Sequence, residues 1–287
     1  MHCLRKSRQG KDNFCQSLLI LTMPLVQLSK LRPQLNALEV HFKDPEMFQE
    51  SLISLFQMYE NKRSSTNIWL RKSAQFASYN VPDSVMSELE SRIAVLSRKM
   101  PDAAIVNADT LWKHSFYELK KTAIVMISNL DNQNENHFFQ KVKSWMTVDL
   151  EDVLTKELLA SIESKPELSQ SKKWLDIIKS WLDSNETQTI KLGLQALKRT
   201  LIHAYQNLPA IFSILTPLLH NPQLAIQKEL TGVIQSLVQL SEAETASFLI
   251  MTGELFPDED VLKYVRKCLP LFDKYFQDEI RRILFTN

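Results

Sequence analysis

Apolar residues recur at spacings of three and four along almost the whole chain, as in the stripe of Ile190, Leu194, Leu197 and Leu201. This period gathers apolar side chains on one face of an α-helix. Only 4 of the 287 residues are glycine, and the 11 prolines stand mostly between the stripes. Such a distribution suits turns between helices better than the hairpins of a sheet. The sequence therefore predicts an all-α protein.

The stripes and the breaks between them predict about fourteen helices, most of them three to five turns long. Their expected ranges are 25–40, 45–59, 66–79, 83–99, 109–130, 136–146, 150–163, 167–183, 187–205, 208–220, 223–240, 242–253, 258–268 and 271–285. Helix pairs recur about every 35–40 residues, which is typical of repeats that bury their apolar faces by stacking on their neighbours. We expect a HEAT/armadillo-like superhelical solenoid, and a compact helical bundle is the alternative.

The domain organisation is expected to be simple. No Ser/Gly-rich or highly charged linker interrupts residues 24–285, which favours a single HEAT-like helical-repeat domain over residues 23–287. Residues 1–22 are predicted to form a poorly structured N-terminal extension, and Met23 is an alternative translation start. The apolar run from Leu18 to Leu21 is shorter than the roughly seven residues that a signal peptide needs.

Composition restricts the chemistry and the location of the protein. No apolar run approaches the roughly 18 residues of a membrane span. The three cysteines, Cys3, Cys15 and Cys268, are far apart and form neither a metal-binding spacing nor a disulfide framework, which favours a reducing, cytoplasmic setting. No glycine-rich phosphate loop or histidine cluster is present, so neither a cofactor nor a metal is expected. Because the net charge is only +1, any nucleic-acid site must be a local basic patch.

Several short segments occur in an order that resembles one known family. They are Ser78-Tyr-Asn-Val-Pro82, Asp109-Thr-Leu-Trp112, Lys143-Ser-Trp145 with Val148-Asp149, and Ile226-Gln-Lys-Glu-Leu230. Over about residues 66–285 the chain resembles a divergent member of the bacterial DNA alkylation repair proteins, which are HEAT-like helical-repeat DNA glycosylases and their non-catalytic relatives. The resemblance rests on the collinear order of the segments, because each alone is short.

The resemblance implies which residues carry the chemistry. Trp145 and Asp149 match an aromatic residue and a carboxylate that hold an alkylated purine nucleotide in the catalytic members. A cationic purine is attracted to an aromatic face, and a carboxylate stabilises the oxocarbenium-like sugar as the base leaves. Lys191 stands where the family has an arginine, and Gly232 stands where it has a second tryptophan, so the active site is incomplete. The alternatives are that Trp145 is a core residue and that Asp149 caps the helix expected from residue 150.

Basic residues indicate where the DNA backbone would bind. The expected contacts are Lys143, Lys172, Lys173, Lys191, Lys198, Arg199 and Lys228. If the basic faces of successive helices line one concave wall, they form a surface that follows phosphates. We therefore expect a protein that binds duplex or damaged DNA on its concave face, with weak or absent glycosylase activity. An active alkylpurine DNA glycosylase and a scaffold for protein partners, without DNA, are the alternatives.

Overall fold

The computed structural model describes residues 28–60, 77–131, 134–202 and 208–285. Among these residues, α-helices dominate, and the one β-type contact is an isolated parallel bridge between Ala77 and Phe116. The α-helices are α2 (Leu28–His41), α3 (Pro45–Tyr59), α5 (Asp83–Lys99), α6 (Pro101–Trp112), α7 (Tyr117–Ser128), α8 (Glu135–Trp145), α9 (Asp152–Glu163), α10 (Pro166–Ser169), α11 (Lys172–Leu182), α12 (Thr187–Thr200), α13 (Leu208–His220), α14 (Gln227–Leu240), α15 (Glu242–Leu255), α16 (Glu259–Cys268) and α17 (Lys274–Leu284), with 3₁₀ turns η3 (Leu224–Ile226) and η4 (Leu269–Leu271).

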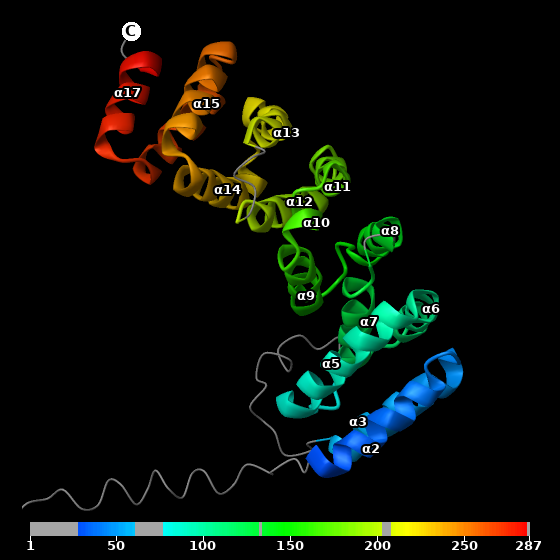
Figure 1. Ribbon diagram of the computed structural model, residues 1–287. Coiled ribbons are helices and arrows are strands. Elements are labelled where there is room, and N and C mark those ends of the chain that lie inside the picture. Colours follow the sequence, from blue (N-terminus) through cyan, green and yellow to red (C-terminus); the bar gives the residue numbers. More distant parts are fainter. Residues whose placement is uncertain (1–27, 61–76, 132–133, 203–207, 286–287) are drawn as a thin grey trace, which may run out of the picture.

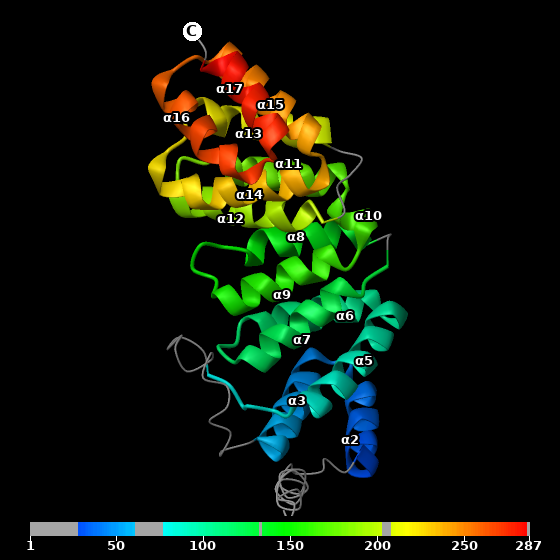
Figure 2. The ribbon, with the colours of Figure 1, turned by 90° about the vertical axis from the view of Figure 1, so that its left-hand side faces the viewer.

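The helices stack in two layers into a curved solenoid (Figure 1). Helices α7, α9, α12 and α14 form one layer, in which each helix packs against the next, and α6, α8, α11 and α13 form the other. The stack bends toward the first layer, so α7, α9, α12 and α14 lie on its concave side and face the viewer in Figure 2. The predicted all-α solenoid is confirmed, and the alternative of a compact bundle is wrong.

Local sequence signals explain several helix ends. The side chain of Asp44 accepts a hydrogen bond from the backbone N–H of Met47 at 3.1 Å, and Pro45 occupies the first turn of α3. Ser171 caps α11 in the same way through the backbone N–H of Trp174, at 3.2 Å. Such caps satisfy backbone donors that have no partner inside the helix. Asp44 and Pro45 therefore mark the start of α3 in the sequence itself.

The prediction of one helix over 109–130 is wrong, because residues 113–116 separate α6 from α7. A contact distant in sequence accounts for the break. The backbone N–H of Tyr117 donates to the carbonyl of Ala77 at 3.0 Å. The buried carboxylate of Glu118 accepts from the hydroxyl of Ser78 at 2.7 Å and from the backbone N–H of Tyr79 at 3.1 Å. The segment that precedes α5 is thus anchored at the start of α7.

Two further ranges need correction. The helix expected over 66–79 does not extend through residues 77–79, which lie in the anchored segment, and its remainder lies outside the described residues. The range 167–183 is divided into α10 and α11, because Ser171 begins a new helix. The predicted extension over residues 1–22 also lies outside the described residues, so the domain boundary at residue 23 remains a prediction.

The core runs continuously along the stack between the two layers. Trp174 and Trp181 are buried in it, and Trp112 packs against it. Gly193 lets α11 and α12 approach closely, because a Cβ atom there would lie 2.7 Å from Cδ2 of Leu182. Within the described part of the chain, no helix has the length and apolar character required to cross a membrane.

Candidate nucleic-acid interface

Two of the predicted DNA contacts lie on α12, where Lys198 is exposed and Lys191 is half-buried. Lys191 and Lys198 lie seven residues apart, and so on the same face of the helix, while Ile190, Leu194 and Leu197 are buried on other faces. Because α12 packs against α9, α11 and α14, its remaining free face points to the concave side. Neither lysine has an ion pair or a side-chain hydrogen bond with any described residue.

The neighbouring helix α14 continues this surface. Lys228 is exposed at its first turn, and Gly232 follows one turn later on the same face. A Cβ atom at Gly232 would lie 3.6 Å from Nζ of Lys198, so the ammonium group of α12 reaches across to α14. The structure thus brings Lys198 next to the position where the resemblance expects a tryptophan. Gly232 itself contributes no side chain there, and the Lys198 side chain lies over it.

One lysine of this surface was missed by the sequence interpretation. Lys156 is exposed on α9 and has no ion pair with a described residue. Its spacing from Asp152 and Ala160, which are also exposed, was the available signal. Arg199, by contrast, is partly buried and forms a 2.7 Å ion pair with Glu163 of α9, which offsets its charge and links two repeats. We call Lys156, Lys191, Lys198 and Lys228 the concave lysines.

The remaining predicted contacts lie on the other layer. Lys143 belongs to α8, and Lys172 and Lys173 begin α11. Lys173 also pairs with Glu135 of α8 at 3.2 Å. Since α8 and α11 lie on the convex side of the stack (Figures 1 and 2), these three lysines do not join the concave lysines. The predicted basic residues therefore form two groups on different layers.

Trp145 lies at the end of α8 and is only 6% exposed. Its ring is stacked on Trp112 of α6, with ring centroids 4.2 Å apart and an interplanar angle of 8°. The ammonium of Lys120 lies 4.7 Å from the centroid of Trp112, a favourable cation–π contact. The structure thus places Trp145 inside an aromatic stack, with one ring face covered by Trp112, as the alternative of a core aromatic expected.

Asp149 lies in the loop between α8 and α9 and is exposed. The interpretation of Asp149 as a helix cap is wrong, because α9 begins at Asp152 and its N-cap residue is Glu151. No ion pair or hydrogen bond joins the Asp149 carboxylate to a described residue. It is therefore a free carboxylate in the loop that leads into a concave helix.

Glu151 is a second unusual carboxylate in the same loop. Both of its oxygens are buried, and neither has a hydrogen-bond partner among the described residues. Burial lowers the pKa of the nearby Lys120 ammonium, and the negative charge of Glu151 acts in the opposite direction. The sequence interpretation singled out neither residue as a site, and their proximity follows only from the fold. The loop thus combines one exposed and one buried carboxylate.

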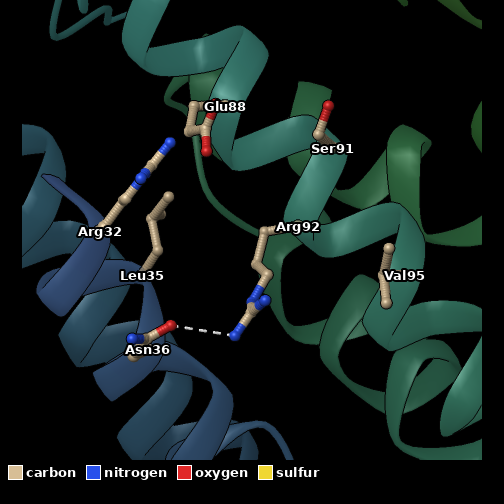
Figure 3. A pocket seen from close by; sticks show the side chains of 7 residues that line it. All are labelled: Arg32, Leu35, Asn36, Glu88, Ser91, Arg92 and Val95. Carbon is tan, nitrogen blue, oxygen red and sulfur yellow. Dashed lines mark hydrogen bonds between the residues drawn. The ribbon is translucent and has the colours of Figure 1, made fainter. Parts of the chain in front are cut away.

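A hollow of about 340 Å³ lies between α2 and α5 (Figure 3). Arg92 donates to Asn36 at 3.0 Å and forms an ion pair with Glu39. Arg32 extends toward Glu88 across the hollow. Two acidic side chains thus accompany the two arginines, and the hollow has no excess positive charge for phosphate. Among the described residues, no group of three or more histidine, cysteine or acidic side chains could hold a metal ion.

Comparisons with known proteins give one family. A family model described as DNA alkylation repair enzyme matches residues 57–258. No curated protein matches the chain. Two solved structures of engineered proteins are each 15% identical to it. The first alignment covers 88% of this chain and 71% of the engineered chain, with a TM-score of 0.36. The second covers 82% of this chain and 96% of the engineered chain, with a TM-score of 0.34. A structure of computationally designed armadillo repeat proteins for modular peptide recognition is 18% identical to it. That alignment covers 67% of this chain and 93% of the designed chain, with a TM-score of 0.29.

Proposed function

We propose that this chain, which belongs to the DNA alkylation repair enzyme family, binds duplex or damaged DNA along its concave face and has weak or absent glycosylase activity. Family membership supports a role related to DNA repair and suggests DNA as the partner. The binding surface and the level of activity are inferred from the arrangement of the side chains.

The concave lysines are the observation that carries the proposal. They come from three successive helices of one layer, and none is neutralised by a described carboxylate. Lysines that neutralise phosphates release condensed counterions, which makes binding favourable at low salt and dependent on salt concentration. If each concave lysine contacts one phosphate, the log–log salt slope should be about −3.6.

The chemistry is inferred to be weak because its groups are not assembled around one base. Asp149 offers an exposed carboxylate, but Trp145 is only 6% exposed and stacked on Trp112. Gly232 offers no ring, and Lys191 retains a charge without the planar, two-pronged guanidinium of arginine. Cation–π attraction on both sides of an alkylated purine is therefore absent from this arrangement.

The two groups of lysines provide a matched test. One variant replaces Lys191, Lys198 and Lys228 by Gln, and the control replaces Lys143, Lys172 and Lys173 by Gln, so that both lose the same charge. Binding is measured by fluorescence anisotropy with a labelled duplex. For the concave variant, the log–log salt slope should be less steep by about 2.7, and the affinity at 0.1 M salt should be about 500-fold weaker. The control variant should bind as the wild type does.

Two outcomes would contradict the proposal. Equal weakening by both variants would mean that charge alone, and not the concave face, determines affinity. Absence of duplex binding by the wild type, even at about 50 mM salt where phosphate contacts are strong, would favour a scaffold that binds proteins. Circular dichroism of both variants would verify that the helical stack is retained.

A further inference from the structure

A second hollow lies at the C-terminal end of the stack, between α16 with the adjoining η4 and α17. It has a volume of about 460 Å³ and is lined by Arg266, Leu269, Pro270, Arg281 and Phe285. The family match ends at residue 258, before the first of these residues. We call this hollow the terminal groove.

Arg266 is the central cation of the terminal groove. Its guanidinium carbon lies 4.5 Å from the centroid of the Phe285 ring, and the side chain remains exposed. It has no ion pair with a described carboxylate, whereas Lys263, three residues earlier, pairs with Glu259 at 2.8 Å. Because a neutral ring orients the guanidinium, its charge and its N–H donors remain available to a ligand.

The adjacent Lys267 is held in a similar way. Its ammonium donates to the side-chain carbonyl of Gln227 at 3.0 Å, so its charge is also not offset by a carboxylate there. On the opposite wall, Arg281 donates to Asp278 and to Gln277, each at 3.1 Å. The residues that line the groove include two arginines and no acidic side chain. The groove is complementary to an anion.

The terminal groove adjoins the proposed DNA surface. Side chains join α16 to α14: the hydroxyls of Tyr264 and Thr231 lie 3.3 Å apart. Gln227, which binds Lys267, immediately precedes Lys228, one of the concave lysines. The row of cations thus passes from α9 and α12 through α14 to the last turn of α16.

We propose that the terminal groove binds a phosphate of the DNA backbone, with the Arg266 guanidinium as its main donor, and extends the concave surface by one helix. This inference rests on the proposed function. A guanidinium presents its donors in a fixed plane that matches the oxygens of a phosphate. The apolar side chains of Leu269 and Pro270, which also line the groove, offer the arginines no competing hydrogen-bond acceptor.

The test uses Arg266→Gln, with Arg282→Gln as the matched control. Arg282 is exposed on α17, next to Arg281 in the sequence, but does not line the groove. With a labelled duplex of about 24 base pairs, Arg266→Gln should lower the salt slope by about 0.9 and the affinity at 0.1 M salt by about 8-fold. Arg282→Gln should leave both quantities unchanged. Arg266→Lys, which keeps the charge but not the planar donors, should give an intermediate affinity.

The outcomes separate this inference from the proposed function. If the wild type binds, the concave variant loses binding and Arg266→Gln binds as tightly as the wild type, the groove proposal is wrong and the concave proposal stands. If Arg282→Gln weakens binding as much as Arg266→Gln, the groove has no specific role. If the wild type does not bind duplex DNA at all, both proposals are wrong. A thermal melt of Arg266→Gln would establish that loss of the Phe285 contact has not unfolded the terminal helices.

Discussion

The packing of the concave helices can be tested with two glycines in equivalent helical settings. Gly193 and Gly232 lie in the interiors of α12 and α14. Replacement of an interior helical glycine by alanine gains about 0.8–1.0 kcal/mol of helix propensity. At Gly232 the added Cβ would lie 3.6 Å from Nζ of Lys198, an ordinary contact with the end of a long side chain. We therefore expect Gly232→Ala to stabilise the protein by about 1 kcal/mol.

At Gly193 the same methyl group meets a filled core. Its Cβ would lie 2.7 Å from Cδ2 of Leu182 and 3.2 Å from Cβ of Trp181, and the second contact cannot be relieved by rotating a side chain. Overpacking of this kind costs about 1–3 kcal/mol. The net effect of Gly193→Ala is then a destabilisation of about 0–2 kcal/mol once the propensity gain is subtracted.

Urea unfolding followed by circular dichroism measures both effects on the same scale. The two variants should differ by about 1–3 kcal/mol, with Gly232→Ala the more stable. Equal stability of the two variants would refute the close approach of α11 and α12. Gly232→Ala should also bind duplex DNA as the wild type does, because its methyl group leaves the Lys198 ammonium in place.

Two further predictions concern the loop carboxylate and the buried carboxylate. Asp149→Asn should reduce any slow release of 7-methylguanine from methylated duplex DNA by about 100-fold, because it removes the negative charge that would stabilise the oxocarbenium-like sugar. Anisotropy should show unchanged binding. Unchanged release would exclude a catalytic role, and rapid turnover by the wild type would show that the active site is complete enough for catalysis. Glu118→Gln should destabilise the fold by about 1–3 kcal/mol in urea unfolding, because it removes the negative charge that strengthens the hydrogen bonds from Ser78 and Tyr79. An unchanged midpoint would mean that Glu118 does not anchor that segment.

Much of the fold could be predicted from the sequence because most helices carry their own signals. The range 83–99 agrees with α5 and the range 208–220 with α13. Asp44 and Pro45 mark the start of α3, because the Asp44 side chain accepts a hydrogen bond from Met47 within the first turn. The break between α6 and α7 could not be predicted in this way, since it is fixed by the bond from Tyr117 to Ala77, which is distant in the sequence.

The layer of each basic residue could not be predicted for another reason. In a two-layer stack, the layer of a helix depends on its place in the alternation of the two layers. A basic residue on one helix does not by itself show that place. Lys143 and Lys191 look equivalent in the sequence, although α8 lies on the convex side of the stack and α12 on the concave side. The stacking of Trp145 on Trp112 could not be predicted for a related reason. It joins the ends of two outer helices, and the two tryptophans are 33 residues apart in the sequence.

The separation of the concave lysines from the aromatic stack has a functional consequence. Phosphates held by Lys191, Lys198 and Lys228 would lie over α12 and α14, while Asp149 lies in the loop that precedes α9. A carboxylate among these three lysines would repel the phosphates and weaken binding, and Asp149 belongs to neither of their helices. Catalysis needs the opposite arrangement, with the carboxylate and an exposed ring around one nucleotide. With Trp145 covered by Trp112 and no ring at Gly232, the arrangement favours binding of DNA over chemistry on its bases.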